Sequence, residues 1–139
     1  MSMSNATENQ VLKMLLQGTD PSYRAGATQY MALVTDAGGA VSEAAPVANE
    51  CTYTGYARVA LTKATAWVDG GSVFTNAALI QFGKRTDAGA TQTVTAFVIV
   101  DTASGAISQG IIGTLSAPLA VNLNIQPQFA PTDCSITAE

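Results

Sequence analysis

The sequence contains no histidine, and only 12% of its 139 residues are charged. Histidine is the commonest general base and the commonest metal ligand, so its absence excludes serine triads, Cys–His dyads and histidine-based zinc chemistry. Typical globular domains carry about 25% charged residues. A surface this poor in charge must be largely serine, threonine, asparagine, glutamine and alanine. Such a surface suits close contact with another protein, and it equally suits a domain that binds nothing.

Basic residues are few and scattered. Six lysines and arginines stand against ten acids, for a net charge of −4, and Lys84 and Arg85 are the only adjacent pair. Nucleic-acid binding requires a clustered basic surface, so we expect no nucleic-acid partner. No apolar run approaches the roughly 20 residues that span a membrane, and no signal peptide is evident at the start. We therefore expect no membrane partner and synthesis in a cytoplasm.

Cysteine and tryptophan are also scarce. Cys51 and Cys134 cannot make a four-ligand zinc site without other ligands, and in a reducing cytoplasm we expect two buried free thiols, with a disulfide as the alternative. Trp67 is either a core residue or an interface anchor. Arg58 lies in an otherwise apolar run, where it is either a solvated outer residue or half of an interface salt bridge.

Hydrophobic residues make up 47% of the chain, which predicts a compact core. The length suits one domain, residues 1–139, that buries about 68–70% of its unfolded surface. We expect short polar arms at both ends, residues 1–6 and 130–139. Between them, Thr7 and Gln10 predict a capping-box helix start, and Gly18 predicts its end. Its apolar face (Val11, Leu12, Leu15, Leu16) should cover an open end of the core or, alternatively, dock on a partner.

The rest of the chain reads as short strands separated by turns. Residues 93–101 are apolar on both faces, with Val94 grouped with Ala96 and Val98, and should form a central strand. Residues 69–72 predict a hairpin, residues 36–40 a turn, and Pro118 a break. Residues 119–129 show the most regular alternation of apolar and polar residues, which predicts one strand. Other strands are expected at residues 29–35, 52–62, 67–68, 73–82 and 107–115. The fold class is therefore all-β: an antiparallel sandwich or jelly roll of about seven or eight strands with one short N-terminal helix.

Carboxylates are the remaining route to catalysis. Asp69, Asp87 and Asp101 lie near predicted strand ends, where such residues are usually turn formers. The loop spacing of calcium ligands and the ending of a phosphate-binding loop are both absent. We expect no enzyme activity, no cofactor and no metal. A carbohydrate-binding module is a further alternative, which would use Tyr53 and Tyr56 as exposed aromatics.

A succession of motifs covers nearly the whole chain: NATEN (residues 5–9), VLKMLLQG (11–18), YMALVT (30–35), GYARV (55–59), a tryptophan, NAALIQF (76–82) and TVTAFVIVD (93–101). In this order they resemble a group of small virion proteins of tailed bacteriophages. Members are described as capsid decoration or cement proteins and as tail or baseplate components. The longer connection between Thr35 and Cys51 and the polar C-terminal tail depart from the usual pattern.

The resemblance implies a capsid cement (decoration) protein like the jelly-roll cement proteins of short-tailed phages. Such a protein would be assembled in the bacterial host cytoplasm, lie on the capsid exterior and clamp subunits of the major capsid protein, as a homo-oligomer (dimer or trimer). A tail or baseplate protein is the alternative. The exposed termini are free to reach a partner, so the expected contact residues lie mostly there: Ser2, Asn5, Thr7, Arg58, Pro127, Gln128, Phe129 and Asp133.

Overall fold

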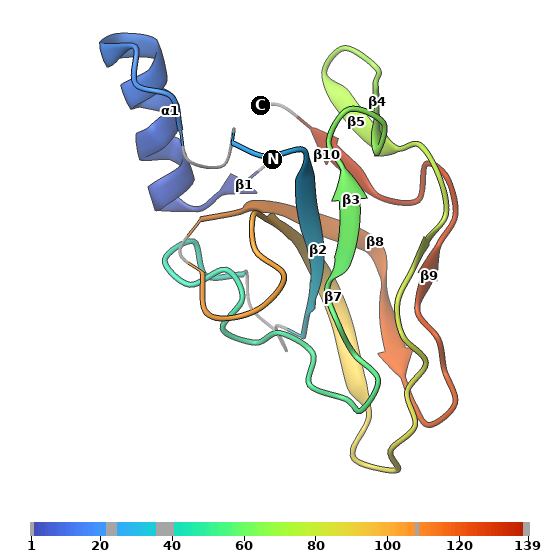
Figure 1. Cartoon of the computed structure of the whole chain (residues 1–139). Helices are drawn as coiled ribbons and strands as arrows, with labels where there is room; N and C mark the ends of the chain where they lie inside the picture. Colours follow the sequence, from blue (N-terminus) through green and yellow to red (C-terminus); the bar gives the residue numbers. More distant parts are fainter. Residues whose placement is uncertain (1, 22–24, 36–40, 108, 138–139) are drawn as a thin grey trace.

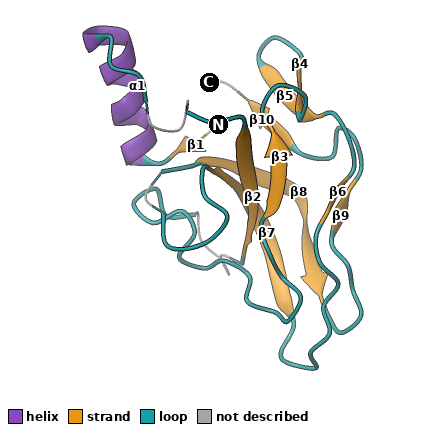
Figure 2. Ribbon diagram, viewed as in Figure 1, coloured by secondary structure: helices purple, strands orange, loops and turns teal. Residues whose placement is uncertain are grey.

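The computed structural model describes residues 2–21, 25–35, 41–107 and 109–137. Over these residues the chain forms ten strands in three antiparallel sheets and one helix (Figures 1 and 2). The predicted fold class, an all-β sandwich with one N-terminal helix, is confirmed. The strand number exceeds the predicted seven or eight because three two-residue strands are too short to leave a pattern. The predicted turn at residues 36–40 lies outside the described residues.

The largest sheet has five strands in the order β1-β8-β7-β2-β3. Their bounds are Ser2–Met3 for β1, Ile111–Val121 for β8, Gln92–Val100 for β7, Thr28–Val34 for β2 and Val59–Thr62 for β3. A second sheet, in the order β10-β5-β4, joins Ser135–Thr137, Val73–Asn76 and Trp67–Asp69. The third pairs β6 (Ile80–Gln81) with β9 (Gln128–Phe129).

Strand β7 is central and buried on both faces, as its apolar composition predicts. Phe97 and Ile99 belong to the larger core cluster, which lies between the five-stranded sheet and the two smaller sheets. Val98 and Val100 belong to a second cluster on the opposite face, with Val47 from the long connection after β2. The core therefore has two layers, and β7 contributes to both.

A bulge changes the pairing of β7 with β8. Val94 pairs with Leu119, but Ala96 pairs with Thr114, so several residues of β8 oppose one residue of β7. The sequence pattern groups Val94 with Ala96, but Val94 lies in the layer of Phe97. The change of layer falls at this irregularity. Pro118 sits within this irregularity. The pairing with β7 is therefore interrupted at the predicted break, but the strand does not end there, because β8 continues to Val121.

The alternation at residues 119–129 does not form one strand. The amide of Ile125 donates to the carbonyl of Asn122 at 3.0 Å, and Asn124 has a φ of 67°, which asparagine tolerates better than most residues. The chain therefore turns between β8 and β9. The predicted strand at residues 73–82 is also divided, into β5 and β6, and in the predicted strand at 52–62 only β3 pairs.

The described residues of the two predicted polar arms, 2–6 and 130–137, are parts of the fold. Ser2 and Met3 pair with Ile112 and Ile111 at the edge of the large sheet, and β10 pairs with β5. Backbone hydrogen bonds hold these segments, and such bonds depend little on side-chain type. The polar composition of the termini therefore did not predict that they pair in sheets.

Helix α1 (Asn5–Gln17) begins one turn earlier than predicted. Ser4, not Thr7, is the N-cap, because its side-chain oxygen accepts the backbone N–H of Thr7 at 3.3 Å. Its end is as predicted: Gly18 adopts a φ of 66° and its amide donates to Met14. Figure 1 shows α1 standing at the same end of the molecule as the β4–β5 hairpin.

Gly113 in β8 offers a stability test of the core. It pairs with Phe97, whose ring lies over the glycine so closely that an added Cβ would overlap it. Phe97 is fully buried and cannot move aside cheaply. We expect Gly113→Ala to lower the free energy of unfolding by about 1–3 kcal/mol through overpacking, measured by chemical denaturation. The exposed Ala120→Ser on the same strand is the control, with a change within about 0.5 kcal/mol. An unchanged Gly113→Ala midpoint would contradict this packing.

Candidate partner-binding surface

Helix α1 is attached to the sheet through a small buried polar cluster. The amide of Gly110 donates to Ser4 Oγ at 3.0 Å and to Thr7 Oγ1 at 2.9 Å, while the amide of Ser4 donates to the carbonyl of Gly110 at 2.9 Å. Thr7 is the one buried residue of α1. The helix is thus held at its N-terminal turn, and its remaining turns extend from this anchor.

The apolar face of α1 is largely exposed. Leu12, Leu15 and Leu16 are 56%, 69% and 79% exposed. The prediction that this face covers an open end of the core is therefore wrong for the isolated chain. Large exposed apolar patches mark interaction sites in proteins. The exposure of these leucines therefore favours the alternative, in which the helix docks on a partner.

A cleft of about 490 Å³ lies beside the helix. Met14 of α1 lines one wall, and Trp67 of β4 and Phe74 of β5 line the other. Ile99 and Ile111 contribute from β7 and β8, so the lining is mainly apolar. Polar groups also line the cleft, among them Gln29, Lys63, Asp101 and Gln109. Trp67 is half-buried and stacks on Phe97, with ring centroids 6.5 Å apart, so it belongs to both the core and the cleft.

The eight predicted contact residues differ in exposure. Asn5, Gln128 and Asp133 are exposed, but Asp133 Oδ2 accepts the amide of Ala130 at 2.8 Å and closes a local turn. Ser2 is paired in β1. The others are buried in the chain: Thr7, Arg58, Pro127 and Phe129. The terminal segments that suggested most of these residues are paired in sheets. Of the eight residues only Thr7 lines the cleft, and their contact with a partner stays a prediction.

Arg58 is neither a solvated residue nor half of an interface salt bridge. Its side chain is 2% exposed and forms two hydrogen bonds to Glu50, at 2.8 and 2.7 Å. It also donates to the carbonyls of Thr102 and Gly105. These hydrogen bonds to Glu50 raise the pKa of Arg58 above its ordinary value. The residue therefore joins two long connections inside the chain.

A second buried arginine was missed by the sequence analysis. Arg85 donates to Asp87 Oδ1 at 2.7 Å and to the carbonyl of Val121 at 2.6 Å. Asp87 also accepts the amides of Thr54 and Gly89. The hydrogen bond from Arg85, followed by that from Thr54, lowers the pKa of Asp87 well below its ordinary value. Arg85 follows Lys84 in the sequence, and the pattern assigned it no role. Asp87, the acid two residues later, was the signal that a buried pair could form here.

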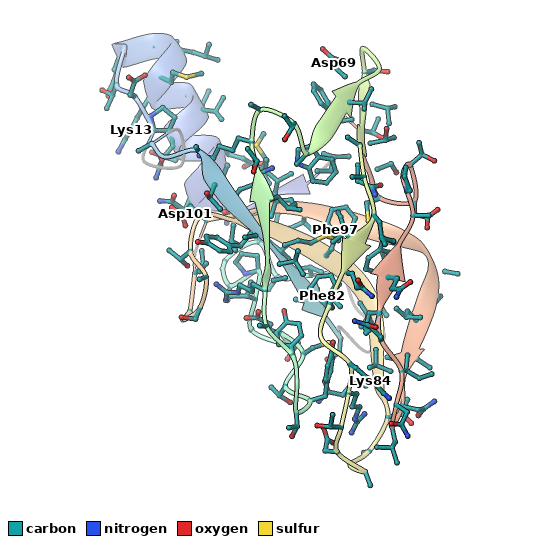
Figure 3. All side chains as sticks on the ribbon, turned by 45° about the vertical axis from the view of Figure 1, so that its right-hand side comes forward. Lys13, Asp69, Phe82, Lys84, Phe97 and Asp101 are labelled. Atoms are coloured by element: carbon teal, nitrogen blue, oxygen red, sulfur yellow. The ribbon has the colours of Figure 1, made fainter. Side chains whose placement is uncertain are left out.

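The three carboxylates considered for catalysis have separate surroundings. Asp69 lies at the tip of the β4–β5 hairpin and accepts the amide of Gly71, while Asp101 lies beside the cleft (Figure 3). Asp87 is paired with Arg85. Among the described residues, no three histidine, cysteine, aspartate or glutamate side chains gather as they would around a metal ion. In that same part of the chain no helix is long and apolar enough to cross a membrane.

The predicted carbohydrate platform is absent at Tyr53 and Tyr56. Tyr53 is 4% exposed and donates to the carbonyl of Gly83. Tyr56 is half-buried, donates to Glu50 and accepts the amide of Leu33. Desolvation, and then the hydrogen bond to Glu50, raises the pKa of Tyr56. Both rings stiffen the core.

Both cysteines are buried free thiols, as expected. Burial raises the pKa of each to about 12. A neutral, desolvated thiol is a poor nucleophile and a poor metal ligand. Cys51 and Cys134 therefore serve the packing of the larger core cluster.

The fold and the exposed helix define a small β protein whose free surface is suited to protein contact. Residues 2–137 match the model of the family Gp80, described as podophage GP4 fiber I protein gp80. Because the match spans almost the whole chain, the protein belongs to this family and is a structural component of a bacteriophage virion. No curated protein matches the chain significantly.

The Arg58–Glu50 pair predicts a large stability effect. Glu50→Gln removes the anion and leaves the buried guanidinium without a countercharge, so we expect a loss of about 3–5 kcal/mol in the free energy of unfolding. Arg58→Met should also destabilise the chain, and the double variant should lose less than the sum of the two. The exposed Glu8→Gln serves as the control. Strict additivity in denaturant titrations would rule out the coupling.

Thiol reactivity tests the core around the cysteines. At pH 8 an aromatic disulfide reagent should leave Cys51 and Cys134 of the native protein unmodified, because both are buried and their pKa values are raised to about 12. In guanidinium without reductant, both should react. Rapid labelling of the native chain would contradict the burial, and failure of both to react after unfolding would indicate a disulfide.

Proposed function

We propose that this protein is a fibre-related structural subunit of the phage particle, which acts by binding other virion subunits and not by catalysis. The observation that supports this most is the family match over residues 2–137, whose name refers to a fibre. The exposed leucines of α1 (Leu12, Leu15 and Leu16) agree with it, because a subunit of a larger assembly keeps surface for its neighbours.

The body suits a mechanical role. Strand β7 is buried on both faces, and the Arg58 and Arg85 networks hold the long connections against the sheets. A rigid body transmits its orientation to the subunits that it contacts. Repeated copies bind more tightly together than each copy does alone, because linked sites raise the effective concentration of one another. A subunit of this kind needs no cofactor. Its chemistry is confined to complementary surfaces.

Catalysis has little support in the arrangement of side chains. The sequence contains no histidine. Asp69 and Asp87 are engaged by backbone amides or Arg85. Asp101 lines the cleft, but a catalytic carboxylate pair needs a second acid nearby, and Asp69 lies away from it at the hairpin tip (Figure 3).

The capsid cement role on the capsid exterior is the second candidate. The low charge of the chain favours it, because a neutral surface can lie against a repeated shell of the major capsid protein with little electrostatic cost. A tail or baseplate location is a third, and the fibre name is compatible with it. The proposals differ in how many copies each particle carries.

Quantitative mass spectrometry of purified particles separates them. For a fibre we expect a small fixed ratio of this chain to the major capsid protein, with labelled antibody at discrete projections in electron micrographs. A ratio near one-to-one, with label over the whole shell, would overturn the fibre proposal in favour of cement. Absence from the particles would contradict any structural role in the virion. Host-cell ribosomal proteins, carried through the same purification, serve as the contamination control.

A further inference from the structure

The apolar face of α1 is wider than the minimum that packing on a single surface requires. Successive residues of a helix are 100° apart. With Met14 added to the four residues Val11, Leu12, Leu15 and Leu16, the apolar face spans about 200° around the axis, from Met14 to Leu16. A helix that covers a single core has an apolar stripe at least about 100° wide. A face of this width can therefore contact two apolar neighbours, one on either side of the helix.

In the isolated chain neither side is fully covered. Met14 lines the cleft and Val11 is half-buried, whereas Leu12, Leu15 and Leu16 are more than half exposed. The anchor at Ser4 and Thr7 fixes the N-terminal turn against Gly110. The leucines therefore cannot turn toward the cleft of their own chain without breaking these buried hydrogen bonds.

The cleft offers a receptor for such a helix. Its two walls, Met14 on α1 and Phe74 with Trp67 on the hairpin, are apolar, and Phe74 is still 37% exposed. The volume of about 490 Å³ is open to solvent between α1 and the hairpin. One molecule thus exposes both an apolar helix and an adjacent apolar cleft, which is the condition for a self-complementary contact.

We propose that α1 of a second copy of this chain occupies the cleft, and that the exchange is reciprocal in a two-fold dimer. In this arrangement the Met14 and Val11 side of each α1 packs on the partner's α1, and the Leu12 and Leu16 side packs on the partner's β4–β5 hairpin. The two contacts account for the 200° width of the apolar face.

Charge agrees with this pairing. The helix carries one acid, Glu8, and one base, Lys13, while the cleft is lined by one base, Lys63, and one acid, Asp101. Neither surface presents a single sign that would repel its own copy. Figure 3 shows Lys13 on the helix side away from the hairpin, so it does not block the cleft of its own chain.

The mass of the purified chain in solution tests the proposal independently of any location in the particle. Light scattering after size exclusion should give twice the 14.2 kDa chain mass, with the dimer persisting in the range of about 1–200 μM. Leu12→Gln with Leu15→Gln and Leu16→Gln should give a monomer. Leu79→Gln, at a residue 54% exposed outside the cleft, is the matched control and should stay dimeric.

Because the triple variant could disturb the helix, Phe74→Ser tests the other wall without touching α1 and should also give a monomer. Circular dichroism of every variant should match that of the unmodified chain. A monomeric unmodified chain throughout the concentration range, or a dimer that survives the variants at both walls, would overturn the proposal.

Cross-linking tests which surfaces meet. A Leu16→Cys chain mixed with a Phe74→Cys chain should form a disulfide-linked heterodimer on mild oxidation. The natural Cys51 and Cys134 are buried and should not compete. A Leu79→Cys chain mixed with the Phe74→Cys chain is the control and should not cross-link. A dimer without the Leu16–Phe74 link would contradict the placement of α1 in the cleft.

Discussion

Strand β7 is buried on both faces, and this constraint organises the rest of the chain. One face requires the large cluster with Phe97 at its centre, which the small sheets, Cys51 and Cys134 close. The other face requires a second layer, for which the connections near Val47 and Ile107 fold back onto Val98 and Val100. Those connections carry polar backbone groups into the interior. Arg58, which is paired with Glu50, donates hydrogen bonds to two of these groups, the carbonyls of Thr102 and Gly105.

With both faces of β7 covered by the sheets and connections, the body does not need α1 as a lid. Ser4, Thr7 and Gly110 hold the helix at its first turn, while its leucines remain outside the core. An apolar helix face carried by a body that is already complete is surplus to the stability of the isolated chain. This division between a closed body and an uncovered helix agrees with a virion subunit, whose function lies in its contacts with other subunits.

The parts predictable from sequence were those that depend on local pattern. Strands β2 and β7 follow from their apolar runs, and Gly18 ends α1 because a left-handed residue is needed there. Residues 119–129 were wrongly predicted to form one strand. The polar residues of an outward strand face, such as Asn122 and Asn124, are also good turn formers, so the alternation alone could not distinguish the two structures. Arg58 and Arg85 could not be placed, because burial of a charge depends on a partner that the fold brings close. The cleft combines residues from α1, the hairpin and β7, and no single segment signals it.

Amide hydrogen exchange of α1, in purified virions and in the free chain diluted until it is monomeric, tests the central claim that this helix is a docking element of the particle. The account predicts fast exchange over residues 5–17 in the free monomer and strong protection in virions, with β7 protected in both states. Equally fast exchange of α1 in virions and in the free monomer would contradict the claim, because an occupied docking helix cannot open as readily as an uncovered one.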